Sequence, residues 1–277
     1  MDKCEIEKLQ NVQLEIMDFI HDICVKNSIP YYLVGGSVIG AVRHKGHIPW
    51  DVDIDIGMHR ENYDRFREYC LTHKFENYSY HDYTNTPNFI PPHALLCKNG
   101  TAVRTKFSKY NKRQREYGIF VDIIPLDNAP SDIKELRKLE KKIRFVQKIK
   151  ARKVCYFYND FSAHKAQHII KKMISMSLFW ISINRLNALE DKTMRLYNGS
   201  TSDLWVAMAG RYSFDKECKP KTIYGEPTLM EFAGRMYYVP EQAHEYLSMT
   251  YGDYMKIPSF EVQNEGYSYY ETITFEE

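Results

Sequence analysis

The chain has 277 residues, of which 44% are hydrophobic and 27% are charged. This balance is typical of an ordinary globular protein that can build a core, as one large domain or as a domain with an appendage. The formal net charge of +2 gives no reason to expect a nucleic-acid partner.

The cysteines and the apolar runs bear on the compartment of the protein. No two cysteines form a CxxC pair, which argues against a zinc site and a disulfide framework and suits a reducing compartment. The N-terminal residues lack the layout of a signal peptide, and the longest apolar run, residues 173–183 (MISMSLFWISI), is shorter than the roughly 20 residues of a membrane span. We therefore expect a cytoplasmic protein. The six cysteines are Cys4, Cys24, Cys70, Cys97, Cys155 and Cys218.

In the N-terminal quarter, the hydrophobic pattern predicts helices and strands in alternation. Residues 3–27 show helical spacing, and residues 31–36 (YYLVGG) predict a short buried strand that stops at two glycines. Residues 37–44 (SVIGAVRH) predict a helix with Ser37 as its N-cap. Residues 51–58 (DVDIDIGM) predict a second strand, and residues 60–70 predict a third helical segment.

The remainder of the chain predicts a mixture of the same elements. Residues 76–116 predict short strands, with a hairpin turn at residues 98–100 (KNG), and residues 118–127 (GIFVDIIPLD) predict a strand ended by Pro125. Residues 131–153 predict a basic helix, and residues 163–197 predict one or two more. Residues 230–240 predict a hairpin, and residues 240–252 predict a terminal helix. We expect an α/β or α+β fold.

Three aspartates alternate with apolar residues in the second predicted strand. Asp51, Asp53 and Asp55 would share one face of that strand. A solvent-facing edge strand would explain such alternation. Carboxylates two residues apart lie ~7 Å from each other, however, so they could also bind a divalent cation.

A glycine pair precedes this strand at the start of a predicted helix. Small residues such as Gly35, Gly36 and Ser37 at a helix N-terminus let backbone N–H groups approach phosphate oxygens. The motif is not a Walker loop, because Ala41 and Val42 stand where Lys and Ser or Thr are required. An ordinary turn between a strand and a helix is the alternative.

Asp122 is the only charged residue in the apolar run of residues 119–124. Burial of a carboxylate is costly unless it is paired or bound to a metal, although a satisfied structural carboxylate is the alternative. With the glycine turn and the paired aspartates, Asp122 completes a layout that could bind a nucleoside di- or triphosphate through one or two Mg²⁺ ions. We expect Arg43, Lys45 and Lys98 either to hold diphosphate oxygens or to be solvated surface cations.

Residues 31–58 (YYLVGGSVIGAVRHKGHIPWDVDIDIGM) resemble the signature of the LicD family, which consists of phosphotransferases with a nucleotidyltransferase fold. Residues 118–127 and 231–258 resemble later blocks of that family. The resemblance implies a nucleotidyltransferase-like mixed β-sheet flanked by helices, with an additional helical region. Relatives usually have an aspartate at the position of Val52, but that side chain points away from the site by strand parity.

The resemblance also implies a reaction and a set of roles. It implies Mg²⁺-dependent transfer (or Mn²⁺-dependent transfer) of a phospho-substituent from a CDP-linked donor, CDP-choline in the characteristic case, to a hydroxyl of a glycan or lipid-linked glycan. Such acceptors are lipopolysaccharide, teichoic acid and capsule. Asp53, Asp55 and Asp122 become metal ligands, and Gly35, Gly36 and Ser37 form the phosphate turn. The alternatives are a CDP-alditol phosphotransferase, a nucleotidyltransferase that moves NMP from an NTP, and a non-catalytic nucleotide-binding relative.

We expect residues 1–130 to form the catalytic core, residues 131–200 a basic and apolar helical insertion, and residues 201–277 the part that completes the core. The basic helix either lies on an anionic membrane at the inner face of the cell or packs by its apolar stripe with a solvated basic face. The many tyrosines either form a cation–π cage for choline or serve mainly in packing. The candidate cage residues are Tyr78, Tyr80, Tyr83, Tyr212 and Tyr224.

Overall fold

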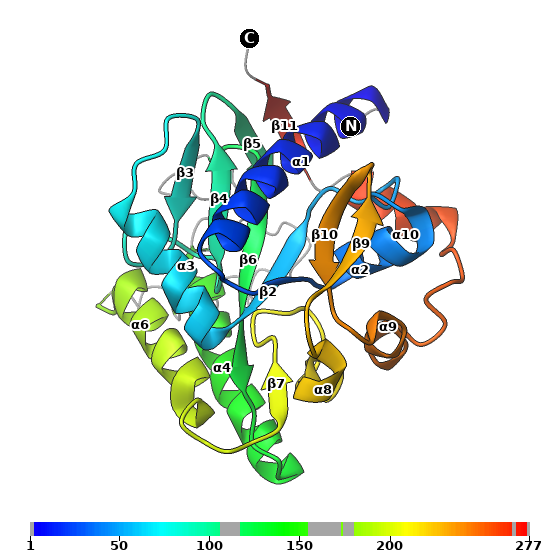
Figure 1. Cartoon of the computed structure of the whole chain (residues 1–277). Coiled ribbons are helices and arrows are strands. Elements are labelled where there is room, and N and C mark those ends of the chain that lie inside the picture. The colour runs from blue at the N-terminus through cyan, green and yellow to red at the C-terminus, as the bar shows by residue number, and fades with distance from the viewer. Residues whose placement is uncertain (1–2, 106–116, 155–172, 174–179, 268–269, 276–277) are drawn as a thin grey trace.

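A mixed β-sheet forms the centre of the molecule in the computed structural model, which describes residues 3–105, 117–154, 173, 180–267 and 270–275 (Figure 1). In this sheet β2 and β6 run parallel, while β1, β4 and β3 pair with their neighbours in the antiparallel sense. The strand order confirms the predicted mixed α/β architecture. The strands in spatial order are β1 (Tyr32–Leu33), β2 (Asp55–His59), β6 (Phe120–Asn128), β4 (Ala94–Lys98) and β3 (Tyr78–His81).

Two amphipathic helices pack on this sheet, as their sequence periodicity predicts. Helix α1 (Lys3–Lys26) crosses in front of β4 and β6 in Figure 1, and its apolar stripe, which includes Leu9, Ile16 and Ile20, is fully buried. Helix α3 (Arg60–Thr72) packs on β2 and β6. Burial of these stripes in the main core, rather than helix propensity, supplies most of the stability of such helices.

The helix after the glycine pair begins one residue earlier than predicted. Helix α2 (Gly36–Ile39) continues directly into a π-helix, η1 (Gly40–His44), and Gly35 occupies the N-cap position. The prediction of Ser37 as N-cap is therefore wrong. Because Gly35 can adopt a φ of 59°, the chain turns before Ser37, whose Oγ instead accepts the backbone N–H of Asp55 at 2.9 Å.

The aspartate strand is shorter than predicted. Strand β2 begins at Asp55, and on one edge the short strand β1 pairs with only Ile56 and Gly57. Before it, Asp51 closes a turn by donating its N–H to the carbonyl of Ile48 at 2.9 Å. The burial of side chains still alternates from residue 51 to residue 56, with the apolar ones inside.

Strand β6 passes through Pro125 instead of ending there. The N–H of Asp122 bonds to the carbonyl of Ile54, the residue before β2, so by alternation the missing donor of Pro125 faces the opposite edge. On that edge β4 pairs only up to Ile123, and β7 (Leu204–Val206) begins to pair at Asp127. Pro125 thus lies where no ladder hydrogen bond is required, and the prediction of a stop was wrong.

The predicted hairpin at residues 98–100 does not form. A turn with Gly100 at a φ of 79° connects β4 to β5 (Ala102–Thr105), but the two strands do not pair with each other. Strand β4 lies between β3 and β6, whereas β5 pairs with β11 (Tyr270–Thr274) from the far end of the chain. Strand β5 therefore pairs with a strand that is distant in the sequence, and not with β4.

The C-terminal part follows its predictions more closely. Strands β9 (Thr228–Phe232) and β10 (Arg235–Val239) form the expected hairpin, and α9 (Ala243–Tyr251) is the expected helix. That helix is not terminal, because α10 (Phe260–Tyr267) and β11 follow it. Between β7 and the hairpin lie the short elements α7 (Phe214–Glu217), β8 (Cys218–Pro220) and α8 (Lys221–Tyr224).

The basic helix packs by its apolar stripe. Helix α4 (Ile133–Val154) buries Leu136, Leu139 and Ile143 in a second, smaller core that also contains Met194 and Phe214. It lies against α6 (Ile183–Met194), below the sheet in Figure 1, and η4 (Arg195–Tyr197) follows. The apolar run of residues 173–183 and the start of the predicted 163–197 region lie largely outside the described residues.

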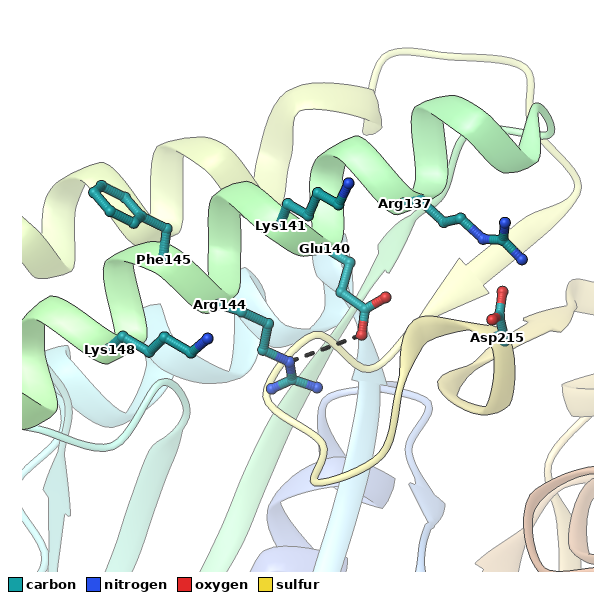
Figure 2. Close-up of a pocket in the computed structure, with 7 residues that line it drawn as sticks. All are labelled: Arg137, Glu140, Lys141, Arg144, Phe145, Lys148 and Asp215. Atoms are coloured by element: carbon teal, nitrogen blue, oxygen red, sulfur yellow. Dashed lines mark ion pairs between the residues drawn. The ribbon is translucent and has the colours of Figure 1, made fainter.

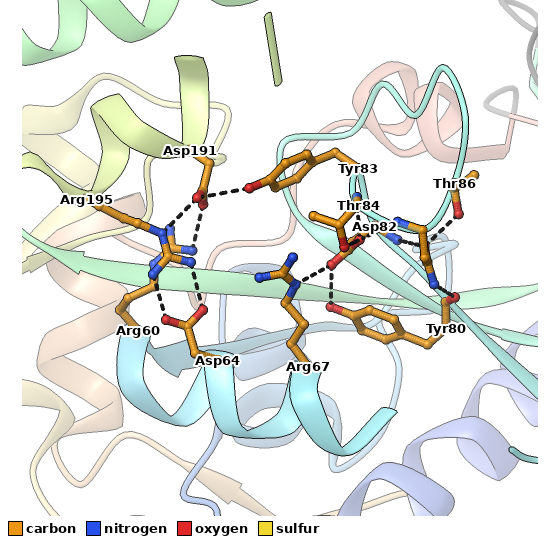
Figure 3. A network of polar contacts seen from close by, with 11 residues as sticks. Arg60, Asp64, Arg67, Tyr80, Asp82, Tyr83, Thr84, Thr86, Asp191 and Arg195 are labelled. Carbon is orange, nitrogen blue, oxygen red and sulfur yellow. Dashed lines mark hydrogen bonds and ion pairs between the residues drawn. The ribbon is translucent and has the colours of Figure 1, made fainter. Parts of the chain in front are cut away.

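A network of ion pairs joins α3 to α6 and the adjacent loops (Figure 3). Arg60 forms a buried bidentate pair with Asp127, at 2.6 and 2.7 Å, and reaches Asp191 at 3.1 Å. Arg195 bonds both oxygens of Asp64, at 2.6 and 2.7 Å.

No described helix is long and apolar enough to cross a membrane. The division into three sequence regions stays a prediction.

Candidate active site

The predicted carboxylates lie together at the start of two neighbouring parallel strands. Asp55 of β2 is in register with Asp122 of β6, so the two side chains leave the sheet on the same face. Asp53 precedes β2 by two residues and is close enough to both that they raise its pKa. Two strands far apart in sequence therefore bring the three predicted ligand residues to one place.

Burial and mutual repulsion make this cluster unfavourable for negative charge. Burial raises the pKa of Asp53 well above its usual value, and the charges of Asp51, Asp55 and Asp122 raise it further. Burial likewise raises the pKa of Asp55, with added repulsion from Asp122, Asp51 and Glu217. Grouped carboxylates with raised pKa values are typical of sites that bind a cation or transfer a proton.

The glycine turn lies directly against this cluster. A Cβ on Gly35 would come within 3.2 Å of Oδ2 of Asp55, and one on Gly36 within 2.8 Å of Oδ2 of Asp51. A positive φ and this close approach explain why glycines occupy the turn. Ser37 joins the turn to the strand through its bond from the N–H of Asp55. All three predicted turn residues are therefore brought to the carboxylates.

His93 is a site residue that the sequence analysis missed. Its Nε2 lies 2.6 Å from Oδ1 of Asp122, while its Nδ1 is buried without a hydrogen-bond partner among the described residues. His93 immediately precedes β4, which places Ala94 opposite Ile123 of β6. Only the pairing of β4 with β6 brings this histidine to the aspartate, and no local pattern in residues 91–93 (PPH) reveals that pairing.

The C-terminal part of the chain closes the other side of the site. The hydroxyl of Tyr246 accepts the N–H of Gly35 at 2.9 Å, and the hydroxyl of Tyr251 would lie 3.8 Å from a Cβ on the same glycine. Glu217 is buried near Asp55 and accepts the N–H of Tyr212 at 3.1 Å. Glu217 belongs to α7, and Tyr246 and Tyr251 belong to α9. The sequence did not indicate them as site residues, because they lie far from the aspartates along the chain.

The three predicted cations are bound elsewhere in this structure. Arg43 donates to the carbonyls of Tyr254 and Lys256, at 2.5 and 3.4 Å, and so holds the segment after α9. Lys45 is exposed and lies 3.7 Å from Glu231. Lys98 lies 3.3 Å from Glu15 of α1. A role for any of them in holding phosphate stays a prediction.

Most of the candidate cage residues serve in packing, which is the second of the two expected roles. Tyr80 and Tyr224 are buried in the main core, Tyr78 stacks on Phe19, and Tyr83 donates to Asp191. Among the five proposed cage residues, Tyr212 differs because its ring packs edge-to-face on Tyr251 at 5.7 Å, beside the site. Likewise Trp50 packs on the core, and His47 lies against Phe232 with a pKa that burial lowers to about 4.

The donor atoms at the site suit a hard cation. No three His, Cys, Asp or Glu side chains among the described residues are arranged to hold a metal ion on their own. Mg²⁺, however, keeps several waters and binds through one or two carboxylates together with substrate phosphates. The in-register pair Asp55 and Asp122, with Asp53 beside it, offers such oxygen ligands, and a cation would relieve their repulsion.

Comparison with known proteins identifies the family. The family model described as LicD/FKTN/FKRP, nucleotidyltransferase domain, matches residues 28–154. Lipopolysaccharide cholinephosphotransferase LicD of Haemophilus influenzae is 30% identical over 264 residues, which cover 95% of this chain and 96% of that protein. Human ribitol 5-phosphate transferase FKRP is 50% identical over 34 residues, 12% of this chain and 7% of that protein. A match of this extent to the Haemophilus protein shows that the chain belongs to the LicD family of phosphotransferases.

Proposed function

We propose that this protein transfers phosphocholine from CDP-choline to a hydroxyl of a cell-surface glycan, in a Mg²⁺-dependent reaction. The observation that carries the proposal is the carboxylate cluster beside the glycine turn, in a chain that is similar over almost its whole length to a lipopolysaccharide cholinephosphotransferase. The acceptor would be a glycan or lipid-linked glycan, such as lipopolysaccharide, teichoic acid or capsule. The reaction would take place in the cytoplasm.

Asp53, Asp55 and Asp122 would hold one or two Mg²⁺ ions, with Mn²⁺ as a substitute. The metal would neutralise the diphosphate and the charge that develops during transfer. The turn of Gly35, Gly36 and Ser37 would lie against the phosphate oxygens, with the backbone N–H of Gly36 as the donor. The N–H groups of Gly35 and Ser37 already bond to the hydroxyl of Tyr246 and to the carbonyl of Val34.

In the proposed step the acceptor hydroxyl oxygen forms a bond to the phosphorus that carries choline. The bond from that phosphorus to the bridging oxygen breaks, and CMP leaves with the electron pair. Asp122, or one of the paired aspartates, takes the proton of the hydroxyl. The hydrogen bond from His93 would fix the orientation of Asp122 for this task. Positioning and charge neutralisation would supply most of the rate, as in other phosphoryl transfers.

CDP-ribitol is the second candidate donor, because a segment of this chain is 50% identical to ribitol 5-phosphate transferases of mouse and human. Phosphocholine is favoured by the similarity that extends over 95% of the chain. The aromatic faces of Tyr212 and Tyr251 beside the site would also favour the quaternary ammonium of choline over an uncharged alditol.

The donor can be identified by offering the purified protein Mg²⁺ with CDP-choline, CDP-ribitol, CDP-glycerol and nucleoside triphosphates in separate reactions. We expect CMP release to be fastest with CDP-choline and to stop when EDTA is added. If CMP is released from CDP-ribitol and from none of the other donors, the protein is a ribitol phosphotransferase and not a cholinephosphotransferase. Release of pyrophosphate from a nucleoside triphosphate, without CMP release from any CDP donor, would overturn both and indicate a nucleotidyltransferase.

A further inference from the structure

A groove of about 430 Å³ runs along α4, and none of the residues that line it is a candidate active-site residue (Figure 2). Its lining is mainly basic, with one exposed aromatic ring and two acidic side chains. The seven residues are Arg137, Glu140, Lys141, Arg144, Phe145, Lys148 and Asp215. We call the exposed residues Arg137, Lys141, Phe145 and Lys148 the basic face of α4.

The cations of the basic face have no partner within the described part of the chain. Arg137, Lys141 and Lys148 are exposed and form no ion pair or hydrogen bond there. Arg144 differs, since it donates to the carbonyls of Gly210 and Tyr212, at 3.0 and 2.5 Å, and thereby anchors the helix to the loop before α7. Packing of α4 does not explain this group of exposed cations, because the helix packs through its apolar stripe, which faces the second core.

Phe145 lies among these cations with 64% of its surface exposed. A large aromatic side chain gains nothing from solvent, and on a helix that is otherwise basic it is typical of a face that lies at a membrane interface. The neighbouring exposed residues Lys134 and Lys142 add positive charge to this helix, whereas Lys138 pairs with Glu135 at 2.7 Å. Charge and ring together fit an anionic lipid surface.

The spacing of the cations argues against a small anion as the occupant. Arg137 and Lys148 are eleven residues apart, about 16 Å along the helix axis, which is too far for both to contact one phosphate group. A bilayer with anionic headgroups presents charge over this whole length and also accepts an aromatic ring. We propose that the basic face of α4 docks the protein on an anionic membrane, with Phe145 entering the headgroup region.

This surface is joined to the candidate active site through one loop. Arg144 holds the carbonyl of Tyr212, and Tyr212 in turn donates its N–H to Glu217, which repels the charge of Asp55. Docking through α4 would therefore bring the loop of residues 210–217 and the adjacent site close to the membrane. Docking of this kind would serve the enzyme equally with any CDP-linked donor.

The test measures sedimentation of the full-length protein with vesicles, in the absence of donor and acceptor. We expect binding to vesicles of equal parts phosphatidylcholine and phosphatidylglycerol, no binding to phosphatidylcholine alone, and release as salt is raised. The triple variant Arg137→Gln, Lys141→Gln, Lys148→Gln should bind about 100-fold more weakly. The single variant Phe145→Ser should bind about tenfold more weakly.

Matched controls separate this face from net charge and from general hydrophobicity. The triple variant Lys8→Gln, Lys26→Gln, Lys74→Gln removes the same charge from exposed positions on α1 and after α3, and Phe260→Ser removes an exposed ring from α10. Both should bind as the wild type does. CMP release with a water-soluble acceptor should be unchanged in every variant, so a failure of docking is distinguishable from a failure of the proposed transferase activity.

Three outcomes would overturn the proposal. The first is equal binding to neutral and anionic vesicles, and the second is an equal loss of binding in the control triple variant. The third is binding of soluble polyphosphate by the wild type without any binding to vesicles, which would assign the basic face to a soluble polyanion instead.

Discussion

At the scale of single residues, burial of the carboxylates makes their charged form unfavourable, and repulsion between neighbouring carboxylates adds to this effect. Asp53 and Asp55 are flanked by Asp51 and Asp122, and burial leaves little water to screen their charges. Such an arrangement costs stability in the protein without metal. In the proposed reaction a divalent cation would offset this cost, because it would neutralise the carboxylates and bind the phosphates of the donor.

The variants Asp53→Asn and Asp55→Asn should separate stability from activity. Each should lose about 10³-fold or more in CMP release, since a charged ligand of the transition state is removed. In the absence of metal, the free energy of unfolding of each variant should be about 1 kcal/mol higher than that of the wild type, because one repelling charge is gone. Asp22→Asn, at an exposed position of α1, is the control and should change neither quantity. Near-full activity in either site variant would refute the metal assignment.

His93 should act as a positioning residue through its bond to Asp122. We expect His93→Ala to lower kcat by about 10- to 100-fold and to weaken Mg²⁺ binding, with little change in the KM for the donor. His93→Gln keeps an N–H donor at the end of the side chain and should recover most of the activity. A merely structural role would instead lower thermal stability in His93→Ala without the selective loss of kcat.

At the scale of elements, the buried pair of Arg60 and Asp127 holds α3 against the end of β6. Their side chains are 4% and 0% exposed, and the amide of Asn198 donates a further bond to Asp127 at 2.6 Å. The pair matters less for its net attraction than for the penalty that follows when one partner is removed. Asp191 and Arg195 extend the network to α6 and η4.

Asp127→Asn should lower the free energy of unfolding by about 3 kcal/mol, because the buried guanidinium of Arg60 loses its bidentate counter-charge and keeps only the single contact with Asp191. The matched change Asp64→Asn breaks a pair with Arg195 whose side chains are 38% and 30% exposed, and it should cost less than about 1 kcal/mol. Urea denaturation of both variants measures the difference. Equal losses would mean that burial does not set the strength of this network.

The elements show how much of the fold and of the site could be predicted from the sequence. Local patterns were sufficient for α1, α3, α4 and the β9–β10 hairpin, because periodicity and turn residues act within one segment. They failed at Pro125, at residues 98–100 and at His93, where the outcome depends on which strand lies alongside. The aspartates and the glycine turn could be predicted, because aspartates that alternate with apolar residues, and small residues at the start of a helix, indicate such a site directly in the sequence. The contributions of Glu217 and Tyr246 have no such local signal.

At the scale of the whole molecule, the carboxylate cluster should make stability depend on pH in an unusual direction. The raised pKa values of Asp51, Asp53 and Asp55 mean that the folded protein keeps these protons at a pH where the unfolded chain has lost them. Between the unfolded value, about 4, and the folded values, the free energy of unfolding therefore falls as pH rises.

Thermal unfolding without metal should show this dependence as a difference between two proteins. From pH 5 upward the wild type should lose stability relative to the double variant Asp53→Asn, Asp55→Asn, in which two of the titrating groups are absent. Adding Mg²⁺ at neutral pH should stabilise the wild type and leave the double variant unchanged. A constant difference at every pH would show that the carboxylates are not coupled as the structure indicates.

The hydrogen bond from Gly35 to Tyr246 has a consequence for the synthesis of the protein. Its two residues are 211 positions apart, and the bond from Arg43 to the carbonyl of Tyr254 spans the same separation. All three candidate metal ligands leave the ribosome within the first 122 residues of the chain, long before Tyr246, which bonds to the glycine turn. In the nascent chain the carboxylates are therefore synthesised before the helix that closes their site. The site can be completed only after α9 has been synthesised and has packed on the glycine turn.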